Sequence, residues 1–313
     1  MKTIGIIGAG AIVELYYINT LKKLGFNDIL LFDTNTERLT KIACKFNIKA
    51  ASIDEINRYC EAIIIATPLD SHFKLCKTFC RSKRTLICEK PFLATLADFD
   101  LLTKIAAETD TTIFVAHIRR CFSANELAYH HLQQHDYGKL LTAHIFEGSR
   151  MNYQSSSNYL HNNPLGGVLY DTGSHAIDSF LWITQLSTAA IIIDNMIVKT
   201  DKEEPSHECS IQFDINKANV YLQLSRIKLL ANKMVLTYER AKVEVPLNLK
   251  PNIIVSTNNL MQVVSCKDAC INYMSEAFKF ELYDLLVVKN TEKYGIENFR
   301  NTTLVLEKLH NER

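Results

Sequence analysis

The fold of this chain is decided by its opening stretch, Thr3-Ile4-Gly5-Ile6-Ile7-Gly8-Ala9-Gly10-Ala11-Ile12-Val13. This stretch predicts a buried strand, a tight turn at Gly8 and Gly10, and a helix that begins near Ala11. The two glycines allow the backbone to approach a pyrophosphate, which then meets the positive end of the helix at Ala11 and Ile12. Val13 stands where a third small residue is usual, which weakens the motif. An ordinary strand-to-helix turn is the alternative interpretation.

Short apolar runs alternate with amphipathic stretches up to about residue 120. The expected strands are 4–7, 29–32, 62–66, 86–88 and 112–116, and the expected helices are 14–24, 36–46, 71–82 and 96–108. Strands this short and apolar are typical of parallel sheets that are covered on both faces. The pattern predicts an α/β protein whose N-terminal part is a Rossmann domain with a doubly wound parallel sheet.

Beyond residue 120 the pattern changes to successive strands without intervening helices. After a helix at 125–134 and a strand at 140–147, strands are expected at 191–198, 210–214, 219–225, 233–238 and 241–245, and helices at 272–288 and 297–309. This order predicts an open, mostly antiparallel sheet whose exposed face could mediate oligomerisation. We therefore expect a dinucleotide-binding domain at 1–120 and an α/β substrate-binding and oligomerisation domain at 121–313.

The composition argues against several classes of partner. A net charge of +1 and the lack of an aromatic-interleaved basic stripe argue against nucleic acid. No apolar run reaches the roughly 18 residues that cross a bilayer, and a single lysine before the first run is a poor secretory signal. The cysteine pairs 76/80 and 266/270 have no nearby histidine that completes a ligand set, so we expect reduced thiols and no metal site. These observations predict a cytoplasmic protein.

The end of the second expected strand bears on the choice of cofactor. Asp33 stands where a carboxylate would accept hydrogen bonds from an adenosine ribose, and its charge repels a 2′-phosphate. NAD is therefore favoured, although Arg38 could still reach the phosphate of NADP. Thr67 and Pro68 follow the third expected strand, where such folds place ligands, and a simple strand-ending turn is the alternative.

Three residues form a candidate catalytic set. Lys90 follows the next expected strand and precedes a proline, while Asp171 and His175 are four apart and share one face of a helix. Histidine titrates near neutral pH and suits the general base that removes a hydroxyl proton. An ammonium group stabilises the developing alkoxide, and Asp171 would orient the substrate or the histidine. Solvated surface charges are the alternative interpretation.

These residues carry a resemblance to the Gfo/Idh/MocA oxidoreductases, which include glucose-fructose oxidoreductase and inositol dehydrogenase. The matching positions are Gly8 to Ile12, Ala66-Thr67-Pro68 with His72, Cys88-Glu89-Lys90-Pro91, and Gly166-Gly167 with Asp171, Gly173, His175 and Asp178. The resemblance implies substrate binding and proton transfer at Lys90, Asp171 and His175. It adds His72, Glu89 and Lys90 to the cofactor site, and His117 and Arg119 to the substrate cleft.

The resemblance and the chemistry together predict an NAD(P)-dependent oxidoreductase that acts on a secondary alcohol or ketone of a sugar, cyclitol or sugar derivative. The polar loop 150–159, with Tyr153, supplies hydrogen-bonding groups for such a substrate. A homodimer or homotetramer formed through the C-terminal sheet is expected. Two alternatives remain open: a non-catalytic dinucleotide-binding regulator, and a reductase of an imine or tetrapyrrole on the same fold.

Overall fold

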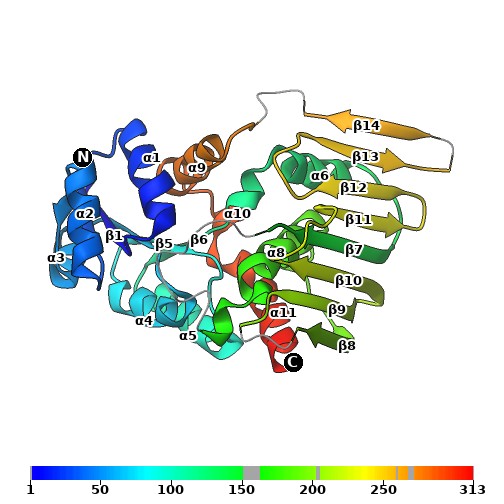
Figure 1. Cartoon of the computed structure of the whole chain (residues 1–313), viewed down its shortest axis with the longest axis horizontal. Coiled ribbons are helices and arrows are strands. Elements are labelled where there is room, and N and C mark those ends of the chain that lie inside the picture. Colours follow the sequence, from blue (N-terminus) through cyan, green and yellow to red (C-terminus); the bar gives the residue numbers. More distant parts are fainter. Residues whose placement is uncertain (1, 151–162, 202–204, 259, 267–270, 313) are drawn as a thin grey trace. The chain divides into compact units, whose positions relative to one another are not determined.

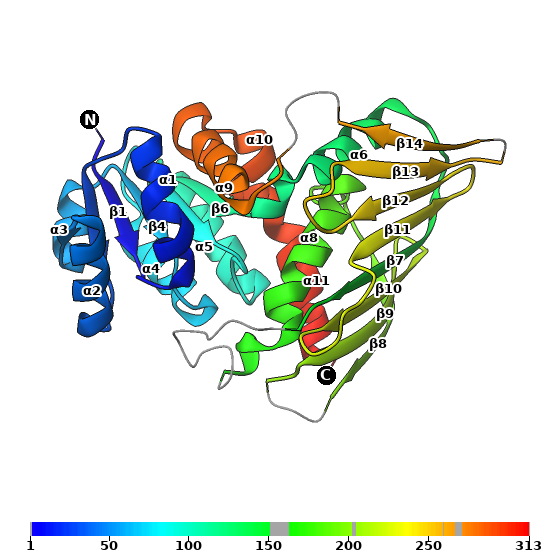
Figure 2. The same ribbon diagram turned by 45° about the horizontal axis from the view of Figure 1, so that its top comes forward.

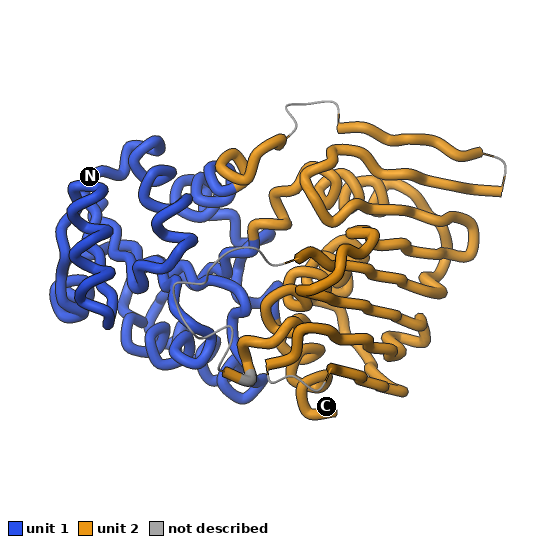
Figure 3. The backbone as a smooth tube through the Cα atoms, in the orientation of Figure 1, with its two compact units in different colours: residues 1–117, 155–157, 278–299 blue, residues 118–154, 158–277, 300–313 orange. Residues whose placement is uncertain are grey.

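The computed structural model describes residues 2–150, 163–201, 205–258, 260–266 and 271–312. These residues form two compact units, coloured separately in Figure 3. Unit 1 contains the described residues up to 117 together with 278–299. Unit 2 contains the described residues of 118–277 together with 300–312. The chain therefore leaves the first unit, builds the second, and returns to the first before it ends in the second.

Unit 1 is built on a six-stranded parallel sheet with the order β3-β2-β1-β4-β5-β6. Its strands are β1 (Ile4–Ile7), β2 (Ile29–Phe32), β3 (Lys49–Ala50), β4 (Ala62–Ile65), β5 (Thr85–Glu89) and β6 (Thr112–Ala116). The strand order reverses after β1, as in a doubly wound sheet, so the Rossmann fold is confirmed. Ligands bind beyond the carboxyl ends of the strands in such sheets.

Helices connect these strands. They are η1 (Val13–Tyr17, a π-helical segment), α1 (Ile18–Lys23), α2 (Thr36–Phe46), α3 (Ile53–Tyr59), α4 (Leu69–Phe79) and α5 (Leu96–Glu108). Figure 1 shows α1 on one face of the sheet and α4 and α5 on the other. Neither β3 nor α3 was predicted from the sequence, although α3 begins with a capping box in which Ser52 and Glu55 satisfy each other's backbone amides.

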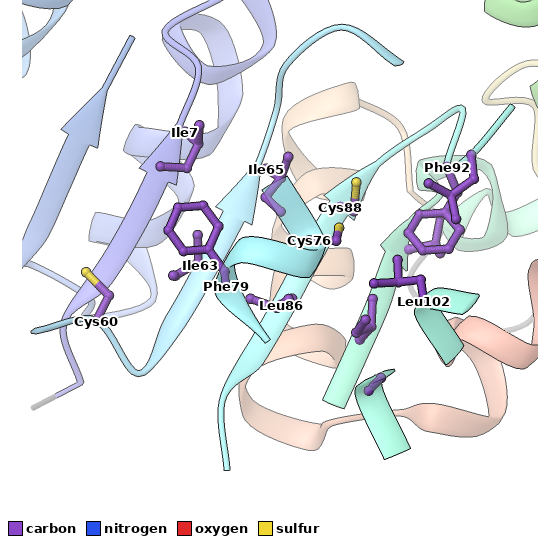
Figure 4. Packing of buried hydrophobic residues seen from close by; sticks show 14 of the residues in the cluster. Ile7, Cys60, Ile63, Ile65, Cys76, Phe79, Leu86, Cys88, Phe92 and Leu102 are labelled. Atoms are coloured by element: carbon purple, nitrogen blue, oxygen red, sulfur yellow. The ribbon is translucent and has the colours of Figure 1, made fainter. Parts of the chain in front are cut away.

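The core of unit 1 lies between the sheet and the helices α3, α4 and α5. Figure 4 shows Ile63 and Leu86 of neighbouring strands packed against Phe79 of α4, all of them fully buried. Cys76 and Cys88 belong to the same apolar cluster. This cluster fixes β4 and β5, and so it fixes the loops that leave their carboxyl ends.

The returning segment 278–299 completes unit 1. It includes the end of α9 (Met274–Tyr283), η5 (Asp284–Val288), α10 (Thr291–Tyr294) and η6 (Ile296–Phe299). Phe278 stacks on Tyr16 with ring centroids 4.4 Å apart, and Gly295 forms an isolated bridge with Phe114. Residues from late in the chain are therefore part of the Rossmann unit.

Unit 2 contains an eight-stranded sheet with the order β14-β13-β12-β11-β7-β10-β9-β8. Its strands are β7 (Leu140–Gly148), β8 (Ile193–Thr200), β9 (Glu208–Ile215), β10 (Ala218–Ser225), β11 (Lys233–Tyr238), β12 (Lys242–Pro246), β13 (Asn252–Ser256) and β14 (Met261–Ser265). Only β7 and β10 pair in parallel, and the other neighbours are antiparallel, as the sequence predicts.

Three helices cover one face of this sheet, as Figures 1 and 2 show: α6 (Ser123–Gln134), α8 (Ser174–Ile183) and α11 (Arg300–Asn311). A fully buried ion pair lies beneath them, with Arg120 Nη2 at 2.7 Å from Asp178 Oδ1. The Thr302 hydroxyl donates to the same carboxylate at 3.2 Å. Asp178 therefore belongs to the core of unit 2. Within the described residues, no helix combines the length and hydropathy needed to cross a membrane.

Candidate active site

The glycine turn after β1 has the geometry that a dinucleotide site needs. Gly8 has a φ of +102°, and a Cβ there would lie 2.3 Å from the carbonyl oxygen of Ala66, so the close approach of these two loops requires glycine. A Cβ on Gly10 would meet nothing within 4 Å. The helix begins directly afterwards, with the amides of Val13 and Glu14 donating to Gly10 O. Open space above a helix N-terminus suits a pyrophosphate.

Asp33 ties this turn to the end of β2. Its side chain is only 9% exposed, and its two oxygens accept the backbone amides of Ala9 and Asn35, each at 2.7 Å. Arg38 Nη1 lies 3.8 Å from Asp33 Oδ2. The carboxylate predicted to meet a ribose therefore also shapes the turn, and a cation stands beside it.

His72 joins the loops that leave β4 and β5. It is fully buried on α4, and its Nε2 lies 2.7 Å from Thr67 O. Its Nδ1 lies 2.9 Å from Pro91 O and 3.0 Å from Phe92 O. Burial lowers the pKa of this histidine, although the three carbonyls oppose the shift. The ring nitrogens thus bond to backbone, and His72 fixes the loop of Thr67 and Pro68 against the loop of Lys90.

Lys90 lies directly after β5, and its side chain is partly exposed. The peptide bond between Lys90 and Pro91 is cis. The preceding residue, Glu89, is turned into the protein and is 7% exposed. One of its carboxylate oxygens accepts the hydroxyl of Tyr17, and the other accepts the Lys90 amide at 3.1 Å. In the structure the Glu89 carboxylate therefore contacts protein groups.

A second buried carboxyl group in unit 1 was missed by the sequence analysis. Glu281 of α9 is fully buried, and the backbone amide of His117 faces its carboxyl group. Burial and the neighbouring charge of Glu89 raise its pKa well above the usual range, against the opposing effect of Lys293. No local motif marks this glutamate, because its environment is created by distant parts of the sequence.

The segment after β6 carries two residues that the resemblance assigns to substrate binding. His117 is 2% exposed, and its ring centroid lies 6.0 Å from that of Phe299. Arg119, in unit 2, forms a two-pronged ion pair with Glu147 at the end of β7, and one of the two contacts measures 2.7 Å. The guanidinium group of Arg119 thus has a carboxylate partner within its own unit.

Asp171 and His175 lie on consecutive turns of one helix in unit 2. Asp171 is in the π-helical segment η4 (Leu169–Gly173), and His175 is in the first turn of α8. The side chain of Asp171 is 23% exposed and accepts an ion-pair contact from Arg226 Nη2 at 2.9 Å. Arg226, which follows β10, is a neighbour of the candidate set that the sequence analysis missed.

The structure therefore brings the predicted residues together in two groups. Unit 1 gathers residues at the carboxyl edge of the parallel sheet: Gly8, Gly10, Ala11, Ile12, Asp33, Arg38, Thr67, Pro68 and Lys90. Unit 2 holds Arg119, Asp171 and His175. Tyr153 and most of its polar loop lie outside the described residues.

Comparisons with known proteins agree with the Rossmann architecture. The family model described as "Oxidoreductase family, NAD-binding Rossmann fold" matches residues 2–117. A curated relative, the UDP-N-acetylglucosamine 3-dehydrogenase of Acidithiobacillus ferrooxidans, is 28% identical over 126 residues. That match spans 40% of this chain and only 39% of the relative.

Two solved structures show that the fold is shared along the whole chain. One is an oxidoreductase from Agrobacterium radiobacter in complex with NAD+, L-tartaric acid and magnesium, with a TM-score of 0.78, 16% identity, and coverage of 99% of this chain and 96% of that one. The other is an aldose-aldose oxidoreductase from Caulobacter crescentus complexed with glycerol, with a TM-score of 0.79, 15% identity, and coverage of 100% and 97%.

Proposed function

We propose that this chain, whose residues 2–117 match the NAD-binding Rossmann model of the Gfo/Idh/MocA oxidoreductases, is a dehydrogenase or reductase of a sugar-type substrate. The reaction transfers a hydride between NAD or NADP and a secondary alcohol or ketone of a sugar, cyclitol or sugar derivative. The name of the curated relative, a dehydrogenase of a nucleotide sugar, supports this substrate class.

The placement of Lys90 carries the proposal. Lys90 follows β5, which neighbours β4 with Thr67 at its end, and β4 neighbours β1 with the glycine turn at its end. A cofactor whose pyrophosphate lies over Gly8 to Ile12 would extend along this edge of the sheet. An ammonium group at the end of β5 is therefore well placed to act beside the nicotinamide end of the cofactor.

Each proposed role follows from the chemistry of the side chain. When bound, the nicotinamide cofactor supplies the centre that accepts or returns the hydride. Lys90 stabilises negative charge on the substrate oxygen, and His175 takes the hydroxyl proton as general base. Asp171 orients the substrate or the histidine. We assign cofactor binding to the first domain, residues 1–120, and substrate binding to the second, residues 121–313.

The second unit also suggests how copies of the chain associate. The face of its sheet opposite the helices carries exposed apolar side chains, among them Ile197 of β8, Ile254 of β13 and Val263 of β14. Apolar groups spread over an open sheet favour association with another protein surface. We propose a homodimer or homotetramer formed through this face, which sedimentation of the purified protein would test.

A substrate screen followed by mutagenesis tests the catalytic assignment. Sugars, inositols and nucleotide sugars are screened by nicotinamide absorbance, and the best substrate is used with Lys90→Met and His175→Gln. Each variant should lose roughly a hundredfold or more in turnover and still bind dinucleotide. The double variant should lose less than the product of the two single losses, because both groups serve one transition state.

Matched controls separate chemistry from general damage. Lys104→Met and His130→Gln change exposed residues of α5 and α6 and should leave turnover unchanged. If either Lys90→Met or His175→Gln kept a near wild-type rate, that residue would have no catalytic role. If no substrate in the panel were turned over by the wild-type protein, the proposed substrate class would be wrong.

A further inference from the structure

A buried carboxylate connects the helix that follows the glycine turn to Lys90. Tyr17 ends η1 and is fully buried, and its hydroxyl donates to Glu89 Oε1. The other oxygen of Glu89, Oε2, accepts the backbone amide of Lys90 at 3.1 Å. Glu89 is therefore held from both sides, by the first helix and by the residue whose side chain is proposed to meet the substrate.

The anchor on the helix side is rigid. The ring of Tyr17 packs edge-on against Phe278, with ring centroids 5.6 Å apart, and no part of Tyr17 reaches solvent. Burial and the neighbouring charge of Glu89 raise the pKa of Tyr17 well above its usual range, so its hydroxyl remains a donor. A neutral donor in a fixed position restricts the rotamer of the carboxylate that it meets.

A second buried carboxyl group, that of Glu281, lies near Glu89. Burial also raises the pKa of Glu89, but the hydrogen bond from Tyr17 and the charge of Lys90 oppose that shift. Burial and the charge of Glu89 raise the pKa of Glu281 well above its usual range, although Lys293 and the backbone amide of His117 oppose that shift. Two adjacent carboxyl groups in an apolar interior rarely ionise together, so we expect the negative charge on Glu89, which has the Tyr17 hydroxyl as a donor and Lys90 as a nearby cation.

We propose that Glu89 is a positioning residue for Lys90, anchored by Tyr17 to the helix that begins at the cofactor turn. The linkage holds the backbone of Lys90 at one fixed distance from that helix. The importance of a well-placed Lys90 rests on the proposed function, whereas the linkage itself is a property of unit 1. Small losses of alignment at a reacting centre lower rates strongly, because the effect of a charged group depends on its distance from the reacting atoms.

Tyr17→Phe tests this linkage by removing one hydroxyl and keeping the buried ring. Tyr16→Phe is the matched control, because its ring also contacts Phe278 and its hydroxyl makes no hydrogen bond within the described residues. Two quantities are measured. The first is the rate at which acetic anhydride acetylates Lys90 in the protein without cofactor, as followed by mass spectrometry. The second is the set of kinetic constants with the best substrate.

Tyr17→Phe should acetylate several-fold faster at Lys90 than the wild type, because the loop is less restrained. It should lose about tenfold in kcat, the effect of a lost hydrogen bond to a charged acceptor, with little change in KM for dinucleotide. A merely structural tyrosine would lower the melting temperature and leave kcat unchanged. Tyr16→Phe should match the wild type in both measurements.

Glu89→Gln supplies a second, independent variant. Its amide oxygen can still accept the Lys90 amide, but its NH2 group then faces the Tyr17 hydroxyl in place of a charged acceptor, so the link to Tyr17 is broken and kcat should fall. Combining it with Tyr17→Phe should add little, since both changes break one linkage. The proposal is overturned if Tyr17→Phe and Glu89→Gln both acetylate at the wild-type rate. A wild-type protein that turned over no substrate would count against the proposed function alone, because acetylation of Lys90 is measured without turnover.

Discussion

Arg226 Nη2 lies 2.9 Å from Asp171 Oδ2, which joins the residue after β10 to the helical segment that precedes α8. The side chain of Arg226 is 4% exposed, and the same nitrogen lies 3.4 Å from the carbonyl oxygen of Gly167. The backbone amide of Arg226 donates to His207 O at 2.9 Å. The aspartate in the proposed catalytic set is thus held by a nearly buried cation within unit 2.

Loss of that cation should affect both stability and turnover. Arg226→Met removes the ion pair between Arg226 and Asp171, and we expect the unfolding free energy to fall by roughly 2–3 kcal/mol, less than for a fully buried pair because Asp171 is 23% exposed. Arg226→Lys should restore part of both losses, because it keeps the charge. Urea denaturation and steady-state kinetics measure the two effects.

Lys228→Met is the appropriate control for Arg226. Lys228 pairs with Glu208 at 2.8 Å, but its side chain is 65% exposed, so its removal should change stability by less than about 1 kcal/mol. Equal stability losses in Arg226→Met and Lys228→Met would show that the ion pair between Arg226 and Asp171 contributes no more to the unfolding free energy than an exposed ion pair does.

The two glycines of the first turn should respond to substitution in opposite ways. Gly10→Val should fold normally, because a Cβ at Gly10 meets nothing within 4 Å, and it should lose dinucleotide binding because the side chain occupies the space of the phosphates. Gly8→Ala should be destabilised by about 1–3 kcal/mol, because its Cβ would collide with Ala66 O and its φ is +102°.

Thermal melts and calorimetric titration with NADH separate the two glycine effects. A Gly10→Val protein that melts like the wild type and binds NADH with unchanged affinity would refute the placement of the pyrophosphate. A Gly8→Ala protein as stable as the wild type would show that the loop of Ala66 can move aside.

Much of unit 1 could be predicted because its information is local. The glycine turn and the apolar runs mark the strands directly, and Asp33 and Lys90 were found from their positions after such runs. The strand β3 was missed because it contains only Lys49 and Ala50, both exposed, and so has no apolar run. The capping box at Ser52 and Glu55 was the available signal for α3.

The two neighbours that were missed depend on tertiary structure. Arg226 matters because β10 ends beside the helical segment of Asp171, and Glu281 matters because a late helix returns to the Rossmann unit and buries a carboxyl group near Glu89. Neither residue type nor spacing distinguishes them from surface charges. Arg226 and Glu281 are important because they are buried, and burial cannot be predicted from a local sequence pattern alone.

Cofactor preference should depend on the opposed charges of Asp33 and Arg38. Asp33→Asn removes the negative charge and keeps an oxygen that can accept the amide of Ala9, so the glycine turn should survive. We expect NADPH to bind about tenfold more tightly in this variant, since a like charge no longer faces the 2′-phosphate. Arg38→Met should weaken NADPH binding and leave NADH nearly unchanged. Fluorescence titration with both cofactors checks this, and wild-type protein that bound NADPH more tightly than NADH would contradict the assignment of NAD.

The buried carboxyl group of Glu281 should make unit 1 less stable as the pH rises. Its pKa is raised well above the model-peptide value of 4.5 by burial and by Glu89. Between these two pKa values the unfolded chain has released the proton while the folded chain retains it, so the unfolding free energy falls as the pH increases. The contribution is fully present below the unfolded pKa and is lost as the pH rises through the folded one.

Glu281→Gln removes this titration while keeping the shape of a protonated carboxyl group. Near pH 4.5 the variant and the wild type should be about equally stable, and by pH 8 the variant should have the higher denaturant midpoint, because the wild type has lost the contribution of its proton. Glu61→Gln, at an exposed position of the same unit, should follow the wild type at every pH. Urea unfolding at three pH values gives the comparison. Parallel pH profiles for Glu281→Gln and the wild type would mean that Glu281 is ionised in the folded protein, and the assignment of a single charge to Glu89 and Glu281 would then fail.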